Sequence, residues 1–182
     1  MTAFSTRWAR GVDPDTTIAG VQFNLSFDHT ILQANSVTEG DLLDQGGAST
    51  FFVGGTIDNV AGTITDVAGA IITPGQTVSS AGTFATISFT ALAAGTSALT
   101  LSGVVVGDIT GTAVSITVTG GSVTVYANWD VNMDGDVNVL DMTLVGQHWG
   151  ETGANHWIRE DVNSDGTVDV LDMIVIGQHW TG

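Results

Sequence analysis

Two acidic stretches near the end of the chain share one spacing of oxygen-bearing side chains. DVNMDGDVNVLD begins at Asp130 and DVNSDGTVDVLD begins at Asp161. In both, Asp or Asn recurs at alternate positions, and glycine stands sixth, where a twelve-residue calcium loop turns sharply. Hard oxygen donors suit Ca²⁺, whereas transition metals prefer His or Cys. The pattern therefore predicts two calcium ions, one in each loop.

Each predicted loop takes its ligands from positions 1, 3, 5, 7, 9 and 12. The candidate ligands of the first loop are Asp130, Asn132, Asp134, Asp136, Asn138 and Asp141. Those of the second loop are Asp161, Asn163, Asp165, Thr167, Asp169 and Asp172. Position 7 offers its backbone carbonyl, and position 12 is Asp rather than the usual Glu. Two solvated Asx-rich turns are the alternative, but a loop repeated at fixed spacing favours calcium.

A short apolar stretch with helical periodicity follows each loop. VLDMTLVGQHW and VLDMIVIGQHW place apolar residues at i, i+3 and i+4, which predicts two amphipathic helices. Aligning residues 130–150 with 161–181 gives 14 identities in 21 positions, so the unit is an internal duplication. A unit this small has little core of its own, and we expect calcium to stabilise its fold.

The chain before residue 126 alternates apolar and polar residues instead. VQFNLSFD (21–28) places Val, Phe, Leu and Phe on one face and polar residues on the other, which predicts a half-buried strand. Seven or more such strands, most of them separated by Gly, Asn-Ser or Pro-Gly, are typical of a sandwich. The expected fold is mainly β: a jelly-roll β-sandwich over 1–126, then a small α-helical module of two calcium loop–helix repeats over 127–182.

Composition excludes several classes of function. The formal net charge is −16 with only three basic residues, so a nucleic-acid binder or a ligand of anionic membranes is not expected. The chain has no cysteine, and no apolar run is long enough for a membrane span. No nucleophile-and-base motif occurs, and we expect no enzyme.

The duplicated unit resembles a dockerin module across residues 130–181. Dockerins have two loop–helix repeats with Asp at position 12, a pattern that both repeats match. The preceding region is similar to a cohesin, the partner of dockerins, in IAGVQFNLSFDHTIL (18–32), VTEGDLL (37–43), AGTFATISFTALAAGTSALTL (81–101) and GGSVTV (120–125). The resemblance implies a non-enzymatic, cellulosome-type assembly protein that uses calcium.

The cohesin resemblance leaves the first strand unaccounted for. Only residues 1–17 precede the first matching stretch, which is room for one strand at most. By the resemblance, the missing strand would lie beside GSVTVYA, whose edge would otherwise stay open. Either another chain donates a strand to this edge, or the sequence is truncated at its N-terminus.

The dockerin resemblance also implies which residues contact a partner. These positions are Val139, Leu140, Gly146 and Gln147 in the first repeat and Val170, Leu171, Gly177 and Gln178 in the second. Because half of them are aliphatic, we expect an apolar contact, although the four aliphatic residues suit the core equally well. We expect Met142, Val145, Met173 and Ile176 in the core. The similar repeats also make two binding orientations plausible.

A dockerin-like region and a cohesin-like region on one chain favour assembly between molecules. About four residues join the last predicted strand to the first loop and reach roughly 14 Å, which is short for folding back. Head-to-tail pairing of copies would generate an extracellular filament. The alternative is an adaptor that links different dockerin- and cohesin-bearing proteins, such as polysaccharide-degrading enzymes. Weak calcium loops suit millimolar surroundings, so we expect an extracellular or cell-surface location.

Three further features receive predictions. The histidines His148 and His179 are expected to have a structural role or to lie at an interface, rather than to bind zinc. Trp149 and Trp180 are expected to anchor the packing of the two repeats, with partner contact as the second reading. Asn24 begins an N-x-Ser triplet and is a possible glycosylation site.

Overall fold

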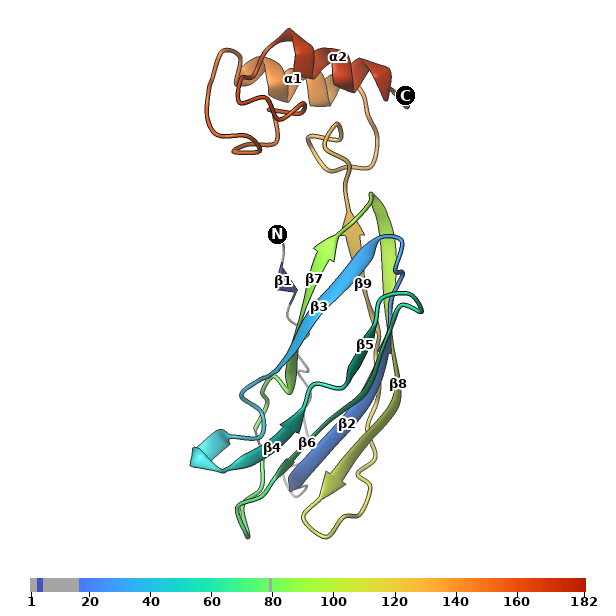
Figure 1. Ribbon diagram of the computed structural model, residues 1–182, viewed down its shortest axis with the longest axis vertical. Helices are drawn as coiled ribbons and strands as arrows, with labels where there is room; N and C mark the ends of the chain where they lie inside the picture. Colours follow the sequence, from blue (N-terminus) through green and yellow to red (C-terminus); the bar gives the residue numbers. More distant parts are fainter. Residues whose placement is uncertain (1–2, 5–16, 79) are drawn as a thin grey trace. The chain divides into compact units, whose positions relative to one another are not determined.

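The structure is a computed structural model that describes residues 3–4, 17–78 and 80–182. The chain divides into two compact units, Met1–Thr124 and Val125–Gly182. The first is built of strands and the second of loops and two helices (Figure 1). The expected fold class is confirmed: the chain is mainly β, with a small helical unit at its C-terminal end.

Two sheets form the β-sandwich. Its strands are β1 (Ala3–Phe4), β2 (Ile18–Ser26), β3 (Leu32–Glu39), β4 (Thr50–Val53), β5 (Thr56–Asp58), β6 (Thr63–Ile71), β7 (Ala85–Ala91), β8 (Gly95–Asp108) and β9 (Gly121–Val125). One sheet has the order β1-β7-β3, and the other has the order β4-β6-β2-β8-β9 with β5 beside β6. A short 3₁₀ helix, Gln45–Gly47, precedes β4.

The core lies between the two sheets, as the alternating pattern predicts. Phe23 and Leu25 of β2 are buried, and Gln22 and Ser26 of the same strand are exposed. Aromatic rings make edge-to-face contacts in this core: the ring centres of Phe27 and Phe89 are 5.2 Å apart, and their planes make an angle of 72°. Period-two burial therefore explains which face of each strand points inward.

The short β1 lies in the other sheet from the edge at which the resemblance places the missing strand. The short β1 pairs antiparallel with β7, with Ala3 opposite Ser88. Among the described residues, β9 has one neighbouring strand, β8, and ends the six-stranded sheet. Strand donation to this edge stays a prediction. Residues 5–16, which belong to the segment before the first matching stretch, lie outside the described residues.

The helical unit has approximate two-fold symmetry. Helix α1 (Val139–Gln147) and helix α2 (Val170–Gln178) each follow one loop. The core takes equivalent residues from both repeats: Val131, Val137 and Val145 from the first, Val162, Val168 and Ile176 from the second. Met142 and Met173 pack against this core, as expected.

Each loop is bonded to the chain that follows the opposite helix. The backbone N–H of Thr181 donates to Val137 O at 3.0 Å, and that of Gly150 donates to Val168 O at 2.8 Å. These two bonds occupy equivalent positions in the two repeats. The segment after each helix therefore bonds to the loop of the other repeat and not to the loop of its own repeat. The unit therefore folds as one body of two intertwined repeats.

Candidate calcium loops and docking surfaces

Four carboxylates at positions 1 and 12 of the predicted calcium loops are buried. Asp130 and Asp161 are 4% and 3% exposed, and Asp141 and Asp172 are completely buried. Among the described residues, the ion pairs are those of His148 with Glu151 and Glu160, so none involves these four carboxylates. Burying charged carboxylates without a countercharge is costly, and a cation in each loop would offset that cost.

The first residue of loop 1 supplies a more specific sign of a metal site. One carboxylate oxygen of Asp130, Oδ2, accepts the N–H of Gly135 at 3.1 Å. The other, Oδ1, is buried and has no hydrogen-bond partner. Because buried polar atoms are nearly always satisfied, this oxygen fits a metal ligand. The residues of loop 1 therefore fit calcium.

Left-handed backbone turns give both loops the same shape. At position 6, Gly135 and Gly166 have φ of 94° and 92°. At position 4, Met133 and Ser164 both have φ of 61°. Side-chain oxygens at positions 3 and 5 accept the N–H two residues on, as in Asn132 to Asp134 at 3.0 Å. These Asx turns fix the side chains of positions 3 and 5 against the backbone of a tight loop.

The position-12 aspartates close each loop onto its helix. Asp141 Oδ1 accepts the N–H groups of Val131 at 2.7 Å and Asn132 at 3.1 Å, and Oδ2 accepts that of Asn138 at 2.8 Å. Asp172 repeats the last of these bonds with Asp169, also at 2.8 Å. In the described part of the chain, no three acidic or histidine side chains form a metal cluster by themselves. A calcium ion would need the amide and backbone oxygens of the loop as well.

Position 9 has a role that the sequence interpretation missed. Asn138 and Asp169 are the N-caps of α1 and α2, and each accepts the N–H of the leucine two residues on. Each forms a capping box with the aspartate three residues later. The spacing Asn-x-x-Asp or Asp-x-x-Asp before an apolar run was the signal for it.

All eight residues that the resemblance assigns to partner contact are on the surface. Val139 and Leu140 are 60% and 55% exposed, and Val170 and Leu171 are 52% and 49% exposed. The choice between core and surface is therefore settled for these four. Their partner contact remains a prediction.

The expected packing role of Trp149 and Trp180 is wrong. They are 53% and 47% exposed, because both helices end two residues earlier, at Gln147 and Gln178. Trp129 instead packs against the core and stacks on His179, with ring centres 3.6 Å apart.

Asn24 is half-buried on the central strand β2. Its Oδ1 accepts the N–H of Asp66 at 2.8 Å, where β6 has a left-handed residue with φ of 60°. A glycan at Asn24, still a prediction, would disturb this support of the β6 irregularity.

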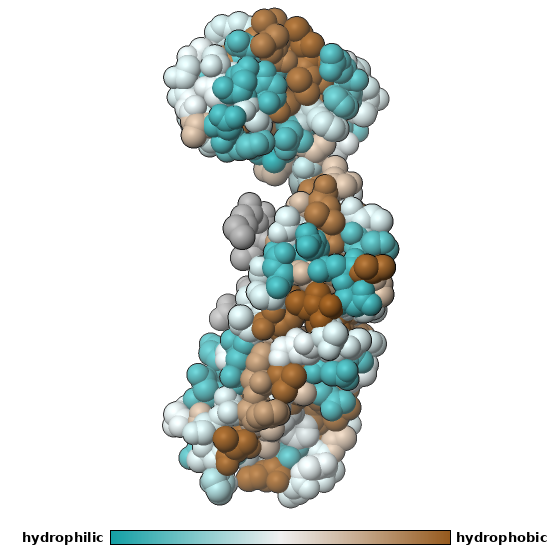
Figure 2. Space-filling view, in the orientation of Figure 1, coloured by the Kyte–Doolittle hydropathy of each residue, from teal (hydrophilic) through white to brown (hydrophobic). Residues whose placement is uncertain are grey.

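The outer face of the six-stranded sheet carries a sandwich patch, defined by Phe51, Val53, Ala68 and Val105. Val53 lies opposite Ala68, and Gln22 lies between Ala68 and Val105. Phe51, Val53 and Val105 are 59%, 40% and 44% exposed. Figure 2 shows apolar side chains on the surface of both units.

The β-sandwich and the duplicated loop–helix unit that follows it each match a known family of domains. A cohesin domain matches residues 10–125, and a dockerin type I domain matches residues 128–179. The chain therefore belongs to the cohesin family and carries a dockerin domain after its cohesin. Both are non-catalytic assembly domains: cohesin domains bind dockerins, and dockerin domains bind cohesins.

Solved cohesin structures match part of the chain. A cohesin module from a family 33 glycoside hydrolase of Clostridium perfringens is 15% identical, with TM-score 0.51, over 63% of this chain and 78% of that one. A non-cellulosomal cohesin from Archaeoglobus fulgidus is 18% identical, with TM-score 0.44, over 59% and 71%. A type II cohesin module from a cellulosomal adaptor scaffoldin of Acetivibrio cellulolyticus is 16% identical, with TM-score 0.48, over 58% and 74%.

No curated protein matches the chain. Among the described residues, no helix is long and apolar enough to cross a membrane.

Proposed function

We propose that the chain is a calcium-dependent assembly module that binds copies of itself head to tail and forms an extracellular filament. In this proposal, the dockerin of one copy docks on the cohesin of the next, and each loop holds one calcium ion. The observation that carries it is the presence of two exposed apolar surfaces on one chain. These are the sandwich patch and the aliphatic pairs that begin α1 and α2.

The chemistry of the two surfaces supports pairing. In the sandwich patch, Ala68 pairs with the exposed Val53 on one side and with Gln22 on the other, and Val105 lies beyond Gln22, so exposed apolar side chains flank one polar residue. Val139 and Leu140 project from the first turn of α1, and their equivalents project from α2. Burial of apolar area is the main favourable term in association, and both surfaces offer it.

Calcium serves this contact indirectly. Asp141 belongs both to the first loop and to the first turn of α1, directly after Leu140. Fixing this carboxylate fixes the helix start and hence the aliphatic pair. The ions are therefore expected to preorganise the docking surface, which lowers the entropy cost of binding.

The direct test is the assembly state of the purified chain with calcium and with EDTA. We expect fibres in calcium by electron microscopy and light scattering, and their loss in EDTA. The double variant Leu140→Asp/Leu171→Asp should prevent assembly, whereas Val60→Asp is a matched control because Val60 is 85% exposed in a sandwich turn. Monomers in calcium at high concentration would contradict self-assembly and favour the adaptor. Fibres that survive EDTA would favour strand donation instead.

A further inference from the structure

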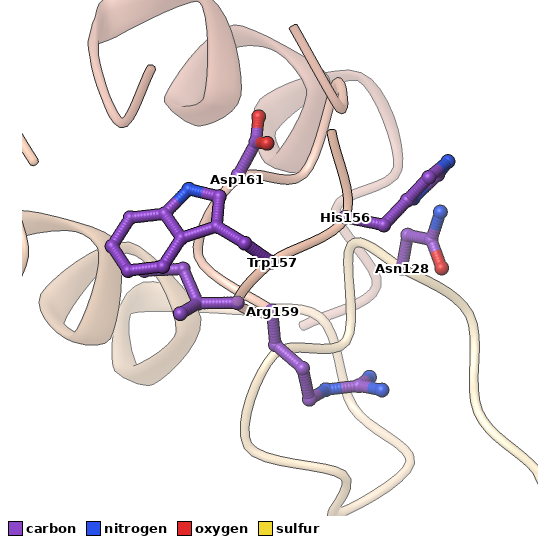
Figure 3. A pocket seen from close by; sticks show the side chains of 6 residues that line it. Asn128, His156, Trp157, Arg159 and Asp161 are labelled. Atoms are coloured by element: carbon purple, nitrogen blue, oxygen red, sulfur yellow. The ribbon is translucent and has the colours of Figure 1, made fainter. Parts of the chain in front are cut away.

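Arg159 lies between the repeats and reaches back to the first loop. Its Nη2 donates to the carbonyl oxygens of Asp130 at 2.6 Å and Ala127 at 3.0 Å. Its Nε donates to Val131 O at 3.2 Å. Yet Arg159 stands only two residues before Asp161, the first residue of loop 2. Figure 3 shows the side chains of Arg159 and Asp161 pointing in opposite directions from this shared segment.

The start of loop 1 is thereby held from two sides. Asp141 accepts the N–H of Val131 at 2.7 Å, and Arg159 donates to the carbonyl of the same residue. The neighbouring carbonyl, that of Asp130, takes the shortest of the Arg159 bonds. Asp130 carries the buried oxygen that lacks a partner. The guanidinium thus fixes the backbone from which a candidate calcium ligand projects.

The second loop is held differently. Asn128 occupies the place equivalent to Arg159, and in the described part of the chain no side chain donates to the carbonyls of Asp161 or Val162. The segment between the repeats braces loop 2 instead. Gly153 N–H donates to Gly166 O at 2.9 Å. This bracing leaves Gly166 buried, whereas its equivalent in loop 1, Gly135, is exposed.

His156 adds to the bracing of loop 2, since its Nδ1 lies 2.6 Å from Ser164 Oγ. His156, Arg159 and Asp161 also line one open pocket of about 250 Å³, together with Asn128 and Trp157 (Figure 3). The chain between the repeats therefore contacts loop 2 through its middle and loop 1 through Arg159. It is a physical connection between the two loops, in addition to the bonds that Gly150 and Thr181 donate to them.

We propose that Arg159 is a positioning residue that couples the two calcium loops: order in loop 2 places its guanidinium on the backbone of loop 1 and raises the calcium affinity of loop 1. This inference rests on the proposed calcium binding. The coupling is reciprocal, because each ion must change the affinity of the other by the same factor. Residues that orient metal ligands from outside commonly change affinity by about tenfold or more.

The sign of the effect separates positioning from charge. A positive guanidinium repels a nearby cation, so removing Arg159 by charge alone would strengthen calcium binding. Loss of positioning weakens it. Arg159→Met removes both the charge and the donors, and Arg159→Lys keeps the charge but cannot form the fork of bonds to three carbonyls. Positioning predicts that both variants weaken loop 1.

The test is a calcium titration of the full chain followed by NMR. The amides of Gly135 and Gly166 report the two loops separately, because each donates to the position-1 aspartate of its own loop. We expect the Gly135 midpoint to rise about tenfold in both variants, and the Gly166 midpoint to rise with it, because the coupling is reciprocal. Asn128→Ala, at the equivalent place, should leave both midpoints unchanged.

A second arm tests the coupling itself. Asp161→Ala/Asp165→Ala disables loop 2, and it should weaken the Gly135 site far more in the native background than in Arg159→Met. Unchanged Gly135 midpoints in Arg159→Met and Arg159→Lys would overturn the inference and leave calcium binding intact. The same holds if the loop 2 variant and Arg159→Met change the Gly135 midpoint additively when combined. No calcium response at either glycine would instead overturn the proposed calcium function. If Arg159→Met does not fold in calcium, Arg159→Lys decides alone.

Discussion

Asp141 illustrates how one short side chain serves both a loop and a helix. Its two oxygens accept three backbone N–H groups, from Val131, Asn132 and Asn138. An aspartate suffices at position 12 because the loop folds tightly against the helix start. Glycine at position 6 makes this possible, since the left-handed backbone there strains any residue with a Cβ.

Replacing Gly135 by alanine should therefore destabilise the helical unit. A residue with a Cβ in the left-handed region costs about 1–2 kcal/mol, and φ is 94° here. Gly146→Ala is the matched control: an added Cβ would make ordinary contact with Met173 Cε at 3.7 Å, and alanine favours the helix by about 1 kcal/mol. Thermal unfolding in calcium should move in opposite directions for the two variants. Equal shifts would contradict the assigned backbone roles.

Asp108 in the sandwich should give a pH-dependent contribution. The Thr110 hydroxyl, 2.7 Å from Asp108 Oδ1, and the Thr112 N–H, at 2.9 Å, lower the pKa of this carboxyl below its ordinary value of 3.8. Because the folded pKa is lowered, the stabilisation is present above the ordinary value and is lost as pH falls through the lowered one. Thr110→Val should raise the pKa in an NMR carboxyl titration. Thr112→Val keeps the backbone donor and should change it less.

At the scale of elements, the sandwich and the helical unit differ in what stabilises them. The sandwich has two sheets with a core of large side chains between them. The helical unit has a core of five valines and one isoleucine, and it buries four carboxylates. Its helices have nine residues each, too few to be stable alone in water.

Calcium removal should accordingly unfold one unit and spare the other. In EDTA we expect the helical unit to lose its fold, because four buried carboxylates then lack a countercharge. Calorimetry should show the sandwich transition unchanged and the other shifted to lower temperature. NMR can assign the change by the Gly135 and Gly166 signals. Two transitions that both ignore EDTA would contradict a structural role for calcium.

At the scale of the whole molecule, the proposed filament needs two surfaces on each copy: the sandwich patch and the aliphatic pairs that begin α1 and α2. A head-to-tail contact does not close on itself in a pair, so it extends into rings or open filaments. The tether between Val125, which ends β9, and Asp130 is short, which supports pairing between copies. The formal net charge of −16 gives a repulsion between free copies that apolar burial must overcome.

A variant chain whose helix starts cannot dock, here called the plug variant, should end the growth of filaments. Leu140→Asp/Leu171→Asp leaves the sandwich patch intact, so the variant can accept one native copy and then ends growth. Increasing fractions of it should shorten fibres of native chain in electron micrographs. Val105→Asp, combined with the plug variant on the same chain, should abolish capping. Fibre lengths that do not change as the fraction of the plug variant rises would contradict head-to-tail growth.

Salt should strengthen assembly. Each chain has a formal net charge of −16, so approaching copies repel one another. Raising the ionic strength shortens the Debye length to about 3 Å at 1 M, which screens this repulsion and leaves apolar burial in place. Sedimentation in calcium should show larger assemblies at high salt. Dissociation at high salt would indicate a contact held by charge pairs instead.

Local patterns were enough to predict much of this protein. Alternation predicts the strands, the 3.6-residue period predicts both helices, and the oxygen spacing predicts the loops, since each depends on neighbours along the chain. The capping role of Asn138 was equally local and readable. The duplication, seen in the sequence, accounts for the two-fold pairing of Val137 and Val168 with the opposite helix ends.

Only the tertiary structure decided which faces are covered. A helical stripe does not say whether Leu140 packs inward or stays exposed, because that depends on what lies against it. The same holds for Trp149, which lies past the helix end, and for β1, which pairs with β7. Arg159 reaches residues some thirty places earlier, and no local pattern encodes such a contact. The sequence determines the local elements and the loop chemistry, and long-range packing selects their exposed surfaces.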